Sequence, residues 1–135
     1  MTVALVGEPF AGYPSARPDM ARHVLIVDDD HESREALREL LRTWGHEVDV
    51  AADGCEAITL ALERRPEVVL LDLGLPDLDG QDVARRIRAA GNPPAIIALT
   101  GSEEPPAPPF DDFILKPADP EPLCIKVERA SAARQ

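Results

Sequence analysis

Aromatic side chains are scarce in this chain of 135 residues, where they make up only 4% of the sequence. The core must therefore be built from aliphatic residues, and a hydrophobic content of 44% is enough for one ordinary domain. There are only two cysteines, Cys55 and Cys124, each on a predicted helix and neither in a metal-spaced pair. We interpret both thiols as reduced and structural, which suits a reducing compartment.

Clustered positive charge and long apolar runs are missing as well. The formal net charge of −11 argues against a nucleic-acid surface and against docking on an anionic membrane. No apolar run is long enough to span a bilayer, and the first residues lack the pattern of a signal peptide. We therefore expect a cytoplasmic protein. Its acidity either serves a divalent cation or a basic partner, or only keeps the chain soluble.

The sequence divides into two parts of different texture. Residues 1–22 contain Pro9, Pro14 and Pro18 and show no sustained periodicity, so we interpret them as a linker or flexible tail. Within them, Val3–Val6 is compatible with a short extra strand. Residues 23–135 form the predicted domain.

From His23 onward, apolar strands alternate with amphipathic helices. The predicted strands are Val24–Val27, Val48–Val50, Val68–Leu71, Ala95–Leu99 and Phe113–Leu115. A helical spacing of apolar residues follows each strand except the fourth. This order predicts an α/β doubly wound fold with a five-stranded parallel sheet. Ligands bind such folds beyond the carboxyl ends of the strands.

Five chemically capable residues follow those strand ends. Asp28 and Asp29 come after the first strand, Asp72 after the third, Thr100 after the fourth and Lys116 after the fifth. Carboxylates packed this closely repel each other unless a hard cation such as Mg²⁺ lies between them. A carboxylate nucleophile, a metal, an ammonium group and a hydroxyl are together the parts of a phosphoryl-transfer site.

Lys116 adds weight to this interpretation. The chain has twelve arginines but only two lysines, Lys116 and Lys126, and a small site needs a point charge rather than a broad guanidinium. Two neighbouring residues are given plain structural roles: Asp30 caps the first helix of the domain, and Lys126 is a surface charge.

Four segments resemble the response-regulator receiver family of two-component signalling. They are "VLIVDDD" (Val24–Asp30), "VVLLDLGLPDLDG" (Val68–Gly80), "IIALTG" (Ile96–Gly101) and "FILKP" (Phe113–Pro117). The resemblance runs from His23 to about Arg129, with the segments in the family's order. It implies a flavodoxin-like fold that depends on Mg²⁺ and takes phosphoryl groups from a histidine kinase or histidine phosphotransferase. The family is not an enzyme family beyond catalysing its own phosphorylation and dephosphorylation.

The resemblance also assigns roles to particular residues. Asp72 would be the phosphoacceptor, and Asp28 and Asp29 would hold the metal with it, aided by the backbone carbonyl of Gly74. Thr100 and Lys116 would bind the phosphoryl group. Phe113 would occupy the aromatic switch position and act in the switch with Thr100. The Lys116–Pro117 peptide bond would be cis.

One segment departs from the family pattern. Residues 101–112 read "GSEEPPAPPFDD" and are shorter than usual, and their four prolines exclude a normal helix, so the family's fourth helix is shortened or missing. We expect an extended, mobile loop with at most one helical turn and fast amide exchange. The sheet face beneath it should be partly bare and serve as a partner surface, including a homodimer through this face and the last helix. The switch would then be an order–disorder change of the loop.

Two other functions remain open. A phosphohydrolase with an aspartate nucleophile usually has a second Asp two residues after the first, where this chain has Gly74. A receiver-like interaction module would keep the site and act by partner binding through its atypical output face. Phosphate incorporation separates the hydrolase from the other two, and partner binding with and without phosphorylation separates those. The sequence leaves open whether the domain stands alone or belongs to a hybrid kinase.

Overall fold

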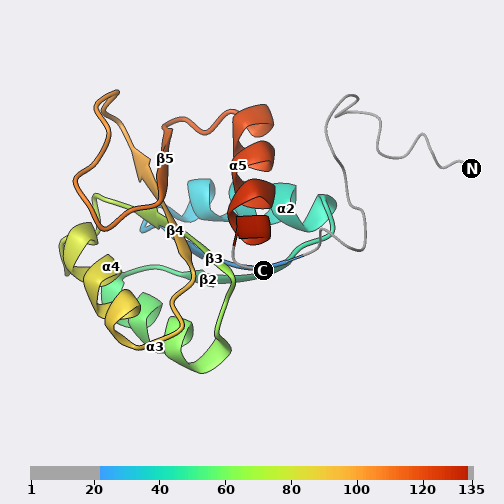
Figure 1. Ribbon diagram of the computed structural model, residues 1–135. Coiled ribbons are helices and arrows are strands. Elements are labelled where there is room, and N and C mark those ends of the chain that lie inside the picture. The colour runs from blue at the N-terminus through green and yellow to red at the C-terminus, as the bar shows by residue number, and fades with distance from the viewer. Residues whose placement is uncertain (1–21, 134–135) are drawn as a thin grey trace, which may run out of the picture.

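The computed structural model describes residues 22–133, which form one sheet with helices on both faces (Figure 1). Along the chain the elements are β1 (His23–Val27), α2 (His31–Thr43), β2 (Glu47–Ala51), α3 (Gly54–Arg64), β3 (Val68–Asp72), α4 (Gly80–Ala89), β4 (Ala95–Thr100), β5 (Asp112–Leu115) and α5 (Pro120–Ala133). Of the expected tail (residues 1–22), residues 1–21 lie outside the described residues, and so does the strand expected at Val3–Val6.

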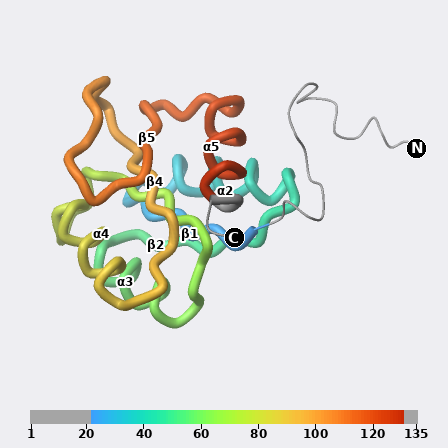
Figure 2. Tube along the Cα trace, viewed as in Figure 1, coloured from blue at the N-terminus to red at the C-terminus, as the bar shows by residue number. Residues whose placement is uncertain are grey.

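All five strands are parallel, in the order β2-β1-β3-β4-β5. The chain winds first toward β2 and then back across β1 toward β5, and Figure 2 lets the reader follow this reversal along the trace. The predicted five-stranded parallel sheet is therefore confirmed. A doubly wound sheet of this kind opens a crevice at its carboxyl edge, between β1 and β3, where the winding direction changes.

Each face of the sheet has its own aliphatic core. One face packs against α2 and α5, with Leu41, Trp44 and Leu123 almost fully buried. The opposite face packs against α3 and α4, where Ala57, Ala61, Val83, Ala84 and Ile87 are buried. Because both faces are covered, β3 and β4 are buried along their whole length.

Three helices begin at an aspartate whose side chain accepts a backbone N–H of the first turn. Asp30 accepts from Ser33, as the sequence predicted, and Asp53 and Asp79 cap α3 and α4 in the same way. Each of these caps ends a loop that leaves the carboxyl edge of the sheet, so the helix starts hold that edge in shape.

The segment between β4 and β5 contains no helix, which confirms the loss of the fourth helix. The face beneath it is less bare than predicted, because Ala98 is fully buried and Phe110 packs against the core on the α3 and α4 side. Leu115, on that same face, is 40% exposed. Within residues 22–133, no helix combines the length and apolar character needed to cross a membrane.

Candidate functional site

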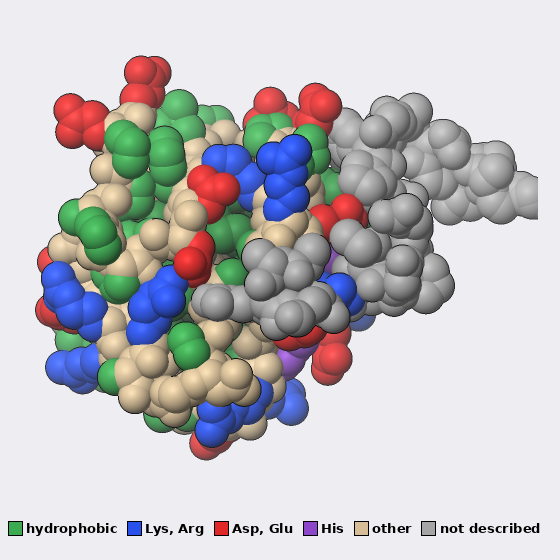
Figure 3. Space-filling model, viewed as in Figure 1, with side chains coloured by type: hydrophobic (Ala, Val, Ile, Leu, Met, Phe, Trp, Pro, Cys, Tyr) green, Lys and Arg blue, Asp and Glu red, His purple; other side chains and the backbone are tan. Residues whose placement is uncertain are grey.

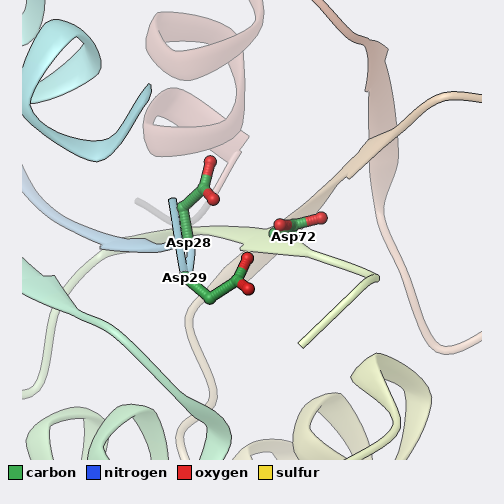
Figure 4. A group of neighbouring side chains, drawn as sticks. All are labelled: Asp28, Asp29 and Asp72. Atoms are coloured by element: carbon green, nitrogen blue, oxygen red, sulfur yellow. The ribbon is translucent and has the colours of Figure 1, made fainter. Parts of the chain in front are cut away.

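The structure brings the predicted site residues together at the carboxyl edge of the sheet. Oxygens of Asp28, Asp29 and Asp72 all lie within 4.8 Å of one another. Figure 4 shows their side chains around one small space, two from the end of β1 and one from the end of β3. The Nζ atom of Lys116, which follows β5, is 3.3 Å from Asp72 Oδ1. The predicted clustering of acids and lysine is therefore present.

Asp28 is the most deeply buried of the three acids, with 1% of its surface exposed. Its Oδ1 accepts the N–H of Asp30 at 2.9 Å, but its buried Oδ2 has no hydrogen-bond partner among the described residues. Burial, together with the neighbouring Asp72 carboxylate, raises the pKa of Asp28 above its ordinary value. A cation beside Oδ2 would remove this penalty.

Asp72 ends β3 and is 5% exposed, whereas Asp29 is open to solvent. The Oδ1 atom of Asp72 accepts the backbone N–H of Gly74 at 3.0 Å and faces the Lys116 ammonium. Both donors hold the carboxylate in a fixed orientation at the mouth of the crevice, which suits a nucleophile that must meet a phosphorus atom in line.

Thr100 and Lys116 are joined through the backbone. The Lys116 N–H donates to the Thr100 carbonyl at 2.7 Å, which aligns the residue after β5 with the end of β4. The Thr100 hydroxyl oxygen accepts the N–H of Ser102 at 3.1 Å, so its own proton stays a donor for another group. The Lys116–Pro117 peptide bond is cis, the geometry that the family resemblance implies.

Gly74 lies in the loop after β3 and is exposed. A Cβ atom added there would contact only Asp72 Oδ1, at 3.8 Å, so the space above the carboxylate is open on this side. The hydrogen bond from the Gly74 N–H to Asp72 keeps this backbone beside the acid cluster.

Phe113 lies on β5 and is half-buried, and Lys126 of α5 holds it in place. The Lys126 ammonium donates to the Phe113 carbonyl at 2.8 Å and to Asp112 at 2.9 Å, and it lies 5.3 Å from the Phe113 ring centroid. The interpretation of Lys126 as a plain surface charge was therefore wrong. The scarcity of lysine in the chain was the signal that pointed to it.

Sequence reasoning also missed two residues that position the site. Arg34, one turn into α2, donates from Nη1 to the Asp28 carbonyl at 2.9 Å and so holds the acidic loop. Asp77 accepts the N–H groups of Gly54 and Cys55 at 2.8 and 3.0 Å, which ties the loop after β3 to the start of α3. These backbone bonds, above all that from Gly54, lower the pKa of Asp77.

The donor set at the edge fits a hard divalent cation. It consists of oxygen atoms only, two of the three carboxylates are buried, and a buried Oδ2 of Asp28 lacks a partner in the described chain. Mg²⁺ binds through a few carboxylates and keeps positions for water and phosphate oxygens. Asp28, Asp29 and Asp72 are the side chains that would hold it.

Two bacterial regulators illustrate the similarity in sequence. The chain is 42% identical over 84 residues to response regulator MprA of Mycobacterium sp. (strain KMS), covering 62% of this chain and 36% of that protein. It is 39% identical over 116 residues to the DNA-binding response regulator MtrA of Mycolicibacterium paratuberculosis, covering 80% and 50%. The chain thus spans half or less of the length of these relatives.

Two solved structures show the similarity in fold. The chemotaxis response regulator CheY4 of Vibrio cholerae matches with a TM-score of 0.75 and 28% identity, over 82% of this chain and 98% of that one. The receiver domain of sensor histidine kinase PA1611 from Pseudomonas aeruginosa matches with a TM-score of 0.76 and 30% identity, over 83% and 98%. That structure holds a magnesium ion in its active-site cleft.

Residues 24–128 match the family described as the response regulator receiver domain, and this range contains every residue of the site built above. Receiver domains are signalling modules of two-component systems that interact with histidine kinases or phosphotransferases and bind Mg²⁺ at an acidic pocket. With the match over most of its length, and with the sheet order and the acid cluster in place, the chain belongs to the response regulator receiver domain family.

Proposed function

We propose that this chain takes a phosphoryl group from the phosphohistidine of a kinase or phosphotransferase onto Asp72. An oxygen of the Asp72 carboxylate attacks the phosphorus, the bond from phosphorus to the imidazole nitrogen breaks, and that nitrogen keeps the electron pair. The observation that carries the proposal is the buried Asp72 carboxylate, grouped with two further acids and 3.3 Å from the Lys116 ammonium.

The other residues of the site support this reaction. Lys116, whose ammonium lies beside Asp72, and the proton of the Thr100 hydroxyl would stabilise the negative oxygens of a phosphoryl group on Asp72. Mg²⁺, held by Asp28, Asp29, Asp72 and the Gly74 carbonyl, would offset the repulsion among the acids and the charge on the phosphoryl oxygens. Asp28, with its raised pKa, stays ionised more readily when such a cation is bound.

Phosphorylation by acetyl phosphate tests the acceptor directly. With Mg²⁺ present, intact-mass spectrometry should show one added phosphoryl group on the unchanged chain and none on Asp72→Asn. Asp82→Asn is a matched control, because Asp82 is an exposed acid on α4 that forms an ion pair with Arg85 of the same helix. Equal labelling of Asp72→Asn and the unchanged chain would refute the assignment.

A second function is favoured by one observation, the absence of a helix in residues 101–111. The chain would then act as a receiver-like module whose atypical output face binds a partner, whether or not Asp72 is phosphorylated. Partner affinity measured with and without phosphorylation distinguishes the two: an affinity that does not respond to phosphorylation supports the second function.

A further inference from the structure

The loop of residues 101–111 stands out from the body of the domain, as the orange trace between β4 and β5 shows (Figure 1). Most of its residues are exposed, including Glu103, Glu104, Pro105, Ala107 and Pro108. No part of the proposed phosphoryl transfer uses these residues. A protruding, exposed segment in place of an output helix calls for a role of its own.

Its sequence restricts its shape even without helix or strand. Each proline fixes its own φ near −65° and forces the residue before it toward extended or polyproline II backbone. In "EEPPAPP", this constraint acts on every position from Glu104 to Pro109, but the chain turns at Pro108 and Pro109, whose shared peptide bond is cis. The stretch available for polyproline II binding therefore ends at Ala107. Such a segment loses little conformational entropy when a partner binds it, and this is the basis of polyproline recognition.

Both ends of the loop are fastened, so its middle is presented rather than loose. At the start, the Ser102 N–H donates to the Thr100 hydroxyl. At the end, the Asp111 N–H donates to the Ile96 carbonyl at 2.8 Å, and Asp111 Oδ2 accepts the Ile96 N–H at 2.7 Å. Arg88 of α4 also holds this end of the loop, because its guanidinium donates to the Pro109 carbonyl at 2.7 Å and to Asp111 at 2.6 Å.

The exposed surface of the loop combines apolar rings with negative charge. Figure 3 shows hydrophobic side chains along this part of the molecule, with acidic side chains at its outer edge. Glu103 and Glu104 are exposed, and neither forms an ion pair among the described residues. A partner must therefore offer flat apolar surfaces for the prolines and positive charge beside them.

We propose that residues 103–107 are a docking segment for a partner protein with an aromatic-lined groove flanked by Lys or Arg. Aromatic grooves bind proline rings in a polyproline II segment, and basic residues beside the groove complement the two glutamates. This inference does not rest on the proposed phosphorylation of Asp72. It assigns a partner chemistry to the atypical output face.

A second copy of this chain does not have the required groove within residues 22–133. The aromatic residues in that range are Trp44, which is 2% exposed, and Phe110 and Phe113, which are half-buried. Phe110 packs against the core, and Phe113 lies beneath the Lys126 ammonium. They lie on different elements and do not line a common groove. We therefore assign the groove to a different protein, and self-association is one outcome of the test.

Site-specific photocrosslinking identifies the partner. The full chain carries a photoreactive phenylalanine in place of Ala107, and a matched version carries it at Glu63, an exposed position on α3. Both are irradiated in extract of the source organism, with and without excess synthetic peptide GSEEPPAPPFDD. We expect a product from position 107 alone, which the peptide abolishes and an all-Ala-for-Pro peptide does not. The crosslink should map to a groove with aromatic and basic residues.

Affinity for the purified partner then tests the prolines. Pro105→Ala combined with Pro106→Ala should weaken binding by about fourfold to thirtyfold, because each proline limits the free chain before binding. Pro93→Ala combined with Pro94→Ala, a proline pair outside the loop, should leave it unchanged. Failure to capture a peptide-sensitive product, a crosslink to a second copy or to a groove without aromatics, or equal affinity of both double variants would overturn the proposal.

Discussion

The hydrogen bonds of Asp111 and Arg88 at the end of the proline-rich loop should be essential for the stability of the β4 and β5 edge. Asp111 carries most of it, since one carboxylate oxygen accepts both the Ile96 N–H at 2.7 Å and the Arg88 guanidinium at 2.6 Å. Asp111→Ala removes both bonds. The N–H of Ile96, a fully buried residue, would then lose its acceptor on Asp111.

The size of the loss follows from these two contacts. Leaving a buried or partly buried N–H unsatisfied costs about 1–2 kcal/mol, and an ion pair as exposed as Arg88–Asp111 contributes at most about 1 kcal/mol. We therefore expect Asp111→Ala to lower the free energy of unfolding by about 2 kcal/mol. For a chain of this size, that lowers the Tm by about 6–10 °C. Asp111→Asn keeps a carbonyl acceptor for Ile96 and should cost about 1 kcal/mol or less.

Urea unfolding followed by circular dichroism measures these changes. Asp82→Ala is the matched control, because it breaks an exposed Asp–Arg pair on the same helix as Arg88 and should cost about 0.5 kcal/mol or less. Amide exchange adds a local readout: the Asp111 N–H should exchange slowly and the Ala107 N–H quickly. If Asp111→Ala were no more destabilising than Asp82→Ala, the loop would not be fastened as described.

The remaining predictions concern the site and its supports. Lys116→Arg should impair phosphorylation-dependent partner binding although the charge is kept, because the forked guanidinium does not replace a point charge; a fully responsive variant would contradict this. Asp29→Ala should weaken Mg²⁺ binding in calorimetry, and an unchanged affinity would refute the shared-cation site. Lys126→Met should cost about 1 kcal/mol in urea unfolding through its lost bonds to β5, so a neutral result would restore its reading as a surface charge. Burial, aided by the Arg22 charge, lowers the pKa of His46 below its ordinary 6.5. At this histidine, only the unfolded chain gains a proton as the pH falls below about 6.5, so the free energy of unfolding should drop by up to about 1.4 kcal/mol per pH unit. A His46→Gln variant whose stability follows the same slope would disprove this.

The sequence alone was enough to predict the fold and the residues that gather at the carboxyl edge of the sheet. Apolar runs of strand length alternated with helical spacing, and that order allows only a parallel sheet with helices on both faces. Since parallel strands end at one edge, Asp28, Asp72, Thr100 and Lys116 had to meet there. Four prolines likewise excluded a helix after β4, because proline lacks the N–H and clashes with the preceding turn.

Contacts between distant segments were beyond the reach of that reasoning. Mobility was expected along the whole loop, but its end is fastened because Arg88 and Asp111, 23 positions apart, meet at the side of β4. Asp77 reaches the start of α3 across a similar separation. Periodicity reports which face of an element a residue occupies, but not which side chain of another element lies within hydrogen-bond distance of it.

The sequence by itself therefore determined which residues gather at the carboxyl edge, since strand order and strand ends follow from local patterns. Only the tertiary structure decided how each is held: Asp28 with one oxygen buried and without a described partner, and Phe113 pinned by a lysine from α5. The physical reason is range. Backbone propensity and hydrophobic spacing act over a few residues, whereas hydrogen bonds and desolvation depend on ångström-scale distances that only the packed chain sets.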